Sequence, residues 1–201
     1  MKKNINSLIS KFMISGVIAL AGITDVVAGT ASTTLRFTTT FIGGGCVVSG
    51  PSSITFNNGE PLLAADIEAA TEAGTPKTST TFEITLSECQ GWGLIPKIKV
   101  SGDKTTAFGS TLFRSSALGP EDSDGYGVYL NTPGNNIFNS NNNLAANSDI
   151  TVKGNWKKED QLSGINSTLP ISAVLRCGNC TYEGRHGGKF QANVTFDLIY
   201  E

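Results

Sequence analysis

Two cysteines separated by two residues, Cys177 and Cys180, have the spacing of a thiol–disulfide catalyst. Such a catalyst needs a helix N-terminus or positive neighbours that lower the pKa of one thiol. Here the pair encloses Gly-Asn, a turn dipeptide, and follows a strand-like stretch. We interpret the pair as a structural disulfide that pins a turn, and we keep a periplasmic thiol oxidoreductase as a remote alternative. Zinc would need four ligands, and only His186 lies near the pair in the sequence.

Other residues with chemical potential lack the spacing that their chemistry needs. His186 is the sole histidine and lies in a glycine-rich turn, which argues against a Ser-His-Asp site. Glu121, Asp122 and Asp124 do not have the spacing of a calcium loop. The glycines at 43–45 precede a cysteine and not a helix, so they do not form a phosphate cradle. The sequence predicts no enzyme activity, no metal and no cofactor.

The N-terminus has the pattern of a secretory signal. Lysines 2, 3 and 11 precede an apolar run over 12–23, and Val26-Val27-Ala28 offers small side chains for cleavage. We therefore predict a signal peptide over 1–28. Its removal takes away three Lys and one Asp and changes the formal net charge from −2 to −4. A mildly acidic chain without a basic stripe disfavours nucleic-acid binding.

All four cysteines lie after this signal, which predicts disulfides formed in an oxidising compartment. Four cysteines allow three connectivities, and the spacing favours Cys46–Cys89 together with Cys177–Cys180.

Short runs rich in Thr, Val, Ile and Phe, broken by turn residues, predict an all-β chain folded as a β-sandwich. A short helical turn is expected within Pro61–Ala73, and a long surface loop over Asn131–Asp149. The expected strands are Leu35–Val48, Ser53–Phe56, Thr80–Ser87, Ile95–Val100, Gly127–Asn131, Leu169–Arg176 and Lys189–Tyr200.

Both ends of the exported chain show the alternation of a strand with one buried face. At the N-terminal end Leu35, Phe37, Thr39 and Phe41 share one face, and a polar arm over 29–34 precedes them. An unpaired strand of this kind recruits other chains, although it could also pair within its own sheet. At the C-terminal end the face consists of Phe190, Ala192, Val194, Phe196, Leu198 and Tyr200.

The sequence resembles pilin subunits of the chaperone–usher pathway, particularly type 1-like fimbrial subunits. Members of that family end in an alternating strand with a glycine fourteenth from the end and a penultimate tyrosine, matched here by Gly188 and Tyr200. Cys46 and Cys89 resemble the family disulfide, and the stretch 125–130 resembles its Gly-x-Gly-Val strand. Two features depart from the pattern: Thr39 stands where many members have glycine, and the Cys177/Cys180 pair is not a general feature.

The resemblance implies an incomplete immunoglobulin-like sandwich that is completed by a strand from outside. The implied organisation is a donor-strand extension over 29–41 and a pilin domain over 42–201, with the C-terminal strand from Gly188 to Tyr200 at the edge of the acceptor groove. Implied partners are other pilin subunits, a periplasmic chaperone, an outer-membrane usher and, for an adhesive subunit, a host receptor. A structural subunit of a surface fimbria is the leading interpretation, and a minor, adapter or single-domain adhesive subunit is the alternative.

Overall fold

The computed structural model describes residues 44–70, 73–115 and 119–201. The predicted signal peptide and the predicted donor strand with Leu35, Phe37, Thr39 and Phe41 lie outside these residues. Among the described residues, no helix is long and apolar enough to cross a membrane.

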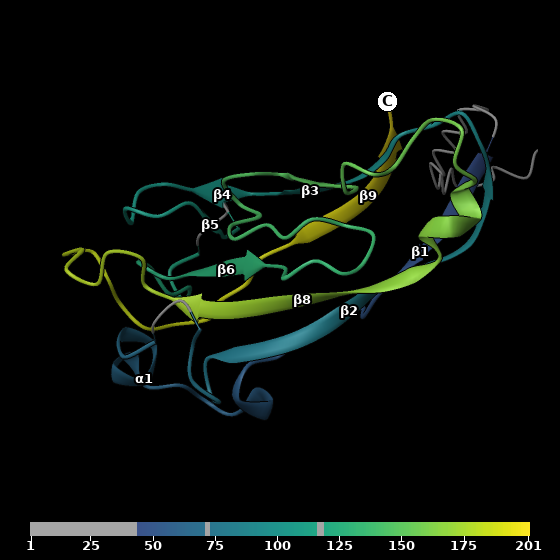
Figure 1. Ribbon diagram of the computed structural model, residues 1–201. Coiled ribbons are helices and arrows are strands. Elements are labelled where there is room, and N and C mark those ends of the chain that lie inside the picture. Colours follow the sequence, from purple (N-terminus) through teal and green to yellow (C-terminus); the bar gives the residue numbers. More distant parts are fainter. Residues whose placement is uncertain (1–43, 71–72, 116–118) are drawn as a thin grey trace, which may run out of the picture. The chain divides into compact units, whose positions relative to one another are not determined.

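Nine strands and three short helical segments make up the described chain (Figure 1). The strands are β1 (Gly44–Ser49), β2 (Ser79–Gly91), β3 (Pro96–Gly102), β4 (Lys104–Thr105), β5 (Leu112–Phe113), β6 (Gly127–Asn131), β7 (Asp149–Thr151), β8 (Ser167–Arg176) and β9 (Val194–Tyr200). The helical segments are η1 (Asn57–Gly59), α1 (Ala64–Glu68) and η2 (Leu162–Ile165).

These strands form two sheets, which confirms the predicted all-β sandwich. One sheet has the order β1-β2-β8-β6-β5-β4 and the other has the order β7-β3-β9. Every pair of named strands is antiparallel. As a result β1 ends one sheet and β9 ends the other, and each has a neighbouring strand on one side only among the described strands.

The core lies between the inner faces of the two sheets. Ile98 and Val100 of β3 and Ile171 of β8 are 0% exposed, and Leu86 of β2 is 1% exposed. The rings of Phe82 and Phe196 meet edge to face at 6.1 Å and link β2 with β9. Alternation along these strands places every second side chain in this core.

The strands predicted around positions 80–100, 127–131 and 169–176 are present, and β2 and β8 extend beyond the predicted bounds. One expected strand is absent, and another is shorter than expected. Residues 53–56 form no strand, and the C-terminal strand begins at Val194, five residues after the predicted start. The loop over 131–149 is also more than a surface loop, because Phe138 and Leu144 are completely buried and fill the core.

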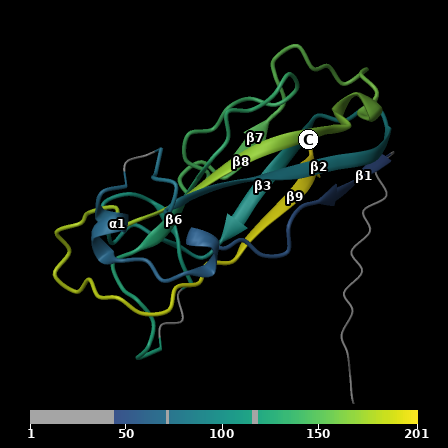
Figure 2. The same cartoon turned by 90° about the horizontal axis from the view of Figure 1, so that it is seen from below.

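The two ends of the described fold are formed by different elements. The helix α1 and the loop that follows β8 lie at one end, where Arg185 and Glu68 form an ion pair at 2.7 Å. Strand β1 and the C-terminus lie at the other end, as both views show (Figure 2). The helical turn predicted within 61–73 is α1, with Ile67 as its buried residue.

Candidate binding groove

An elongated cavity of about 850 Å³ lies between the segment after β1 and the C-terminal segment of the chain. Residues 51–56 line one side of this groove and residues 187–188 and 190–196 line the other. Its floor comes from the inner face of the six-stranded sheet, whose side chains there are apolar. The floor residues are Phe82, Ile84, Val128, Leu130, Ala173 and Leu175.

The C-terminal wall of the groove is an edge strand with a partly buried apolar face. Strand β9 pairs with β3 from Pro96↔Tyr200 to Gly102↔Val194 and has no described strand on its other side. Val194, Phe196 and Leu198 pack against the core but remain partly exposed, whereas Ile98 and Val100 of the adjacent β3 are fully buried. The side chains of β9 are therefore more exposed than those of β3, and the edge of β9 that faces away from β3 has no described neighbour.

The first half of this wall is held by a loop and not by a strand. Ser123 N donates to Lys189 O at 2.7 Å, and Lys189 N donates to Glu121 O at 2.8 Å. Ser115 N donates to Gln191 O at 3.1 Å. Because these bonds go to loop residues, residues 190–193 form no strand although their side chains alternate like those of one. Phe190 and Ala192 nevertheless line the groove.

Gly188 lies where this segment comes closest to the loop over 119–124. A Cβ at this position would lie 2.5 Å from the backbone oxygen of Glu121, closer than real Cβ contacts come. Only glycine therefore allows the backbone to approach the loop at this point. The sequence identified this glycine by its distance from the C-terminus, and the structure supplies the steric reason for it.

A buried arginine supports the same wall, and the sequence reasoning missed it. Arg114 is 6% exposed and donates to the backbone oxygens of Tyr126, at 2.7 Å, and of Ser123. Its guanidinium lies 5.9 Å from the centre of the Phe190 ring and 3.9 Å from an oxygen of Asp124. A single Arg after two apolar residues carries no pattern that would separate it from a surface Arg.

One residue that lines the groove has a buried polar atom without a partner among the described residues. Ser123 is 4% exposed, and its Oγ makes no hydrogen bond within the described part of the chain. Buried hydroxyls are normally paired, because desolvation without a hydrogen bond costs about 1–3 kcal/mol. Ser123 also escaped the sequence reasoning, since nothing distinguishes it from other serines in loops.

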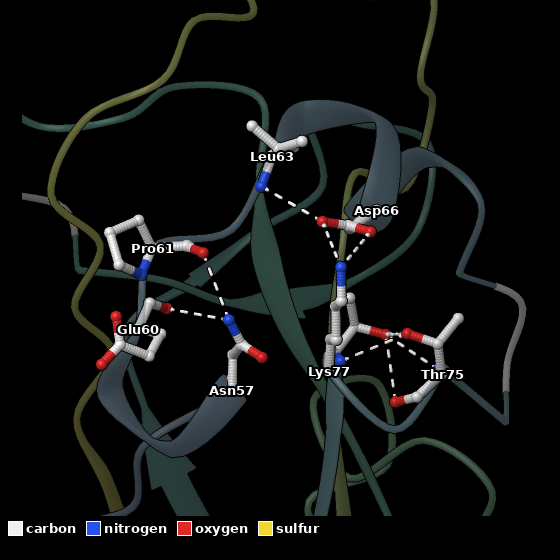
Figure 3. A network of polar contacts seen from close by, with 8 residues as sticks. Asn57, Glu60, Pro61, Leu63, Asp66, Thr75 and Lys77 are labelled. Atoms are coloured by element: carbon white, nitrogen blue, oxygen red, sulfur yellow. Dashed lines mark hydrogen bonds and ion pairs between the residues drawn. The ribbon is translucent and has the colours of Figure 1, made fainter.

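The opposite wall is a loop fixed by local polar contacts (Figure 3). The Asn57 amide donates to the backbone oxygens of Glu60 and Pro61, both at 3.2 Å. Asp66 accepts from Leu63 N at 3.4 Å and pairs with Lys77 at 3.0 Å. Residues 53–56 run beside the groove and pair with no strand that the structure describes, although their Ile, Thr and Phe are typical of strands.

The sheets approach each other beyond the end of the groove at β1. The Tyr200 Oη lies 4.0 Å from Cys46 Sγ, and burial raises the pKa of the Tyr200 phenol above its ordinary value. Next to it Lys97 contacts Glu201 and Asp149. The hydrogen bond to Glu201 has the largest effect in raising the pKa of the Lys97 amine, and the one to Asp149 the next largest. This end is therefore closed by β1, β3 and β9 themselves.

Both disulfides have the pairing that the spacing favours. Cys46–Cys89 joins β1 to β2 beside a register shift between Gly45 and Val47. Cys177–Cys180 closes the first turn after β8, and the backbone of the enclosed Asn179 donates to Phe108 O. Neither cysteine of this second pair lines the groove.

The remaining candidate residues are engaged in local structure. Glu121 pairs with Lys189 at 2.6 Å, and Asp122 accepts from Gly119 N at 2.6 Å. Asp124 accepts from Gly125 N at 2.8 Å, and His186 is exposed. Within the described ranges no three His, Cys, Asp or Glu residues come together in a way that could hold a metal ion.

Comparisons with known proteins found similarity in structure but not in sequence. No protein-family model matches the chain, and no curated protein matches it. Among solved structures the chain is similar to the one described as the crystal structure of the P pilus rod subunit PapA. The two are 18% identical with a TM-score of 0.46, and the match covers 84% of this chain and 99% of that chain. The sandwich fold rests on the strands themselves, and a likeness of this degree does not define a function.

Proposed function

We propose that this chain is a structural subunit of an adhesive surface fimbria and that it polymerises by donor-strand exchange. Residues 29–41 of one copy fill the groove of the next copy. The observation that carries the proposal is the apolar groove bordered by β9, an edge strand with a half-covered apolar face. A free strand edge beside exposed core side chains favours the addition of a strand.

The proposed donor matches the groove in chemistry. A strand rises about 3.3 Å per residue, so positions 35–41 extend about 20 Å. Leu35, Phe37 and Phe41 share the face that would meet the apolar floor. Burying each of these side chains contributes about 1.5–3 kcal/mol, and the backbone adds hydrogen bonds to the open edge of β9.

The proposed route to the surface joins the export signal of the sequence with the partners that the family resemblance implies. The predicted signal over 1–28 directs the chain out of the cytoplasm, and the two disulfides suit an oxidising compartment. A subunit with an open groove is prone to aggregate, so a periplasmic chaperone that lends a strand protects it until an outer-membrane usher delivers the next subunit. This route rests on the family resemblance of the sequence, and the function involves no enzyme activity.

A peptide complementation experiment tests the proposal. The exported chain without residues 29–41 is mixed with a synthetic peptide of residues 29–41, and thermal unfolding is recorded. At about 100 times Kd the peptide stabilises the fold by about 2.7 kcal/mol. For a domain of this size that corresponds to a rise in Tm of about 5–10 °C.

The matched control is the same peptide with Leu35, Phe37 and Phe41 replaced by Asn. We expect this peptide to leave Tm unchanged, because it offers no apolar face to the groove. Equal stabilisation by both peptides, or none by either, would contradict the proposal. Normal assembly of fibres from the chain that lacks 29–41 would contradict it as well.

A further inference from the structure

Trp92 is one of the two tryptophans of the chain, and it is 68% exposed. The other, Trp156, is half-buried and donates its indole N–H to the backbone oxygen of Leu94 at 3.0 Å. Tryptophan is highly buried on average, because its ring carries a large apolar area, and it is enriched at the centres of protein interfaces. The exposed ring of Trp92 is therefore a candidate contact for a partner.

The backbone around Trp92 is held in a defined conformation. Gly91 and Gly93 on either side have φ angles of 116° and 81°, in the region that favours glycine. Gly93 N donates to Lys158 O at 2.8 Å, and Trp92 itself forms an isolated antiparallel bridge with Gln161. A ring presented from a fixed backbone loses little conformational freedom when a partner covers it.

Trp92 lies beside the residue at which β1 begins. The strands β1 and β2 are antiparallel, and Gly44, the first residue of β1, pairs with Gly91, the last residue of β2. Paired Cα atoms are about 4.5–5.5 Å apart, and the next Cα along the chain adds about 3.8 Å. The Cα of Trp92 is therefore within about 10 Å of that of Gly44.

The length of the chain limits how far a bound copy can lie from this point. The proposed donor segment ends at residue 41, and only residues 42 and 43 separate it from Gly44. Three peptide units span at most about 11 Å between Cα atoms. A second copy that holds 29–41 in its groove therefore has part of that groove within about 11 Å of Gly44, on which side Trp92 is exposed.

We infer that Trp92 is a contact between successive copies of this chain, and that the copy whose groove holds residues 29–41 covers its ring. The contact rests on the proposed function and goes further, because it adds an interface of the folded domain to the strand in the groove. It also separates a whole subunit from a free peptide of residues 29–41, since the peptide brings no Trp92. A donor subunit is thus bound more tightly than its own donor segment alone.

The accessibility of Trp92 in a pair of copies tests this inference. The first copy carries Trp156→Phe and the donor segment, and its own groove is filled with the peptide of residues 29–41. The second copy lacks residues 29–41 and carries Trp92→Phe and Trp156→Phe, so Trp92 of the first copy is the only tryptophan in the pair. When the pair forms, acrylamide quenching of this tryptophan should fall and its emission should shift to shorter wavelength.

A binding measurement with Trp156 unchanged gives a second readout. Replacement of Trp92 by Ala in the first copy should weaken its binding to the second copy by about 10–30-fold, the loss expected for an interface hot spot. The matched control is the same substitution in the second copy. It should leave the affinity unchanged, because no copy is attached beside Gly44 of the second copy.

The outcomes separate this inference from the proposed function. If Trp92 is quenched as readily in the pair as in the first copy alone, or if Trp92→Ala weakens binding equally in either copy, the inferred contact is wrong. In both cases the pair still forms, and donor-strand exchange is left intact. If the wild-type copies form no pair at all, both proposals are overturned.

Discussion

Arg114 shows how one residue shapes a groove whose walls are mostly apolar. Its guanidinium holds the backbone oxygens of Tyr126 and Ser123 and packs over the Phe190 ring. The side chain is almost fully buried, so its charge is tolerated only because these acceptors and the nearby Asp124 satisfy it. Arg114 thus connects the loop that carries Ser123 with the C-terminal wall.

Replacement of Arg114 by Met should lower the free energy of unfolding by about 2–4 kcal/mol. Methionine keeps much of the packing volume, but it leaves two buried carbonyl oxygens without donors. Urea unfolding of the exported chain measures the change. Arg176→Met serves as the control, because Arg176 is only partly buried and lies 4.3 Å from the Tyr129 ring. A loss no larger for Arg114 than for Arg176 would refute this role.

Residues were predictable from the sequence where their role leaves a periodic or spacing signal. The cysteine pairs and the alternating face that ends in Tyr200 have such signals. The structure forms both disulfides, and Phe190, Ala192, Val194 and Phe196 of that face line the groove, whereas Leu198 and Tyr200 do not. Arg114 and Ser123 act through contacts between segments that are distant in the sequence, so no local pattern marks them. Their importance depends on burial, which only the folded chain defines.

The same limit applies to the elements. Alternation records which side chains face the core, and it correctly located β2, β3, β6 and β8. It does not record whether the backbone has a strand beside it. Residues 53–56 and 190–193 have strand-like side chains but border the groove without strand pairing, so both segments were assigned to strands wrongly.

The two disulfides should differ in their contribution to the fold because they close loops of different length. Cys46 and Cys89 are 43 residues apart, and Cys177 and Cys180 only 3. In the chain-entropy model the first is worth about 4 kcal/mol and the second about 2 kcal/mol. Urea unfolding of the variants Cys46→Ala/Cys89→Ala and Cys177→Ala/Cys180→Ala compares them under oxidising conditions. A larger loss for the second variant would show that the turn after β8 does more than close a short loop.

For the molecule as a whole, three features show that the groove is incomplete. Strand β9 has a described strand on one side only, its apolar face is half covered, and the Ser123 hydroxyl has no partner among the described residues. A single strand added along β9 would pair its open edge and cover its apolar face at once. The chain itself carries a segment of suitable pattern over 29–41, which makes a second copy the natural source.

Hydrogen exchange along β9 tests the central claim most directly. Amides of residues 194–200 that point away from β3 should exchange fast in the chain without residues 29–41. They should slow by about 100-fold when the peptide of residues 29–41 is added, because each gains a backbone partner that opens only when the strand leaves. Amides of β9 that are already slow without the peptide, or that keep exchanging fast at saturating peptide, would contradict the account.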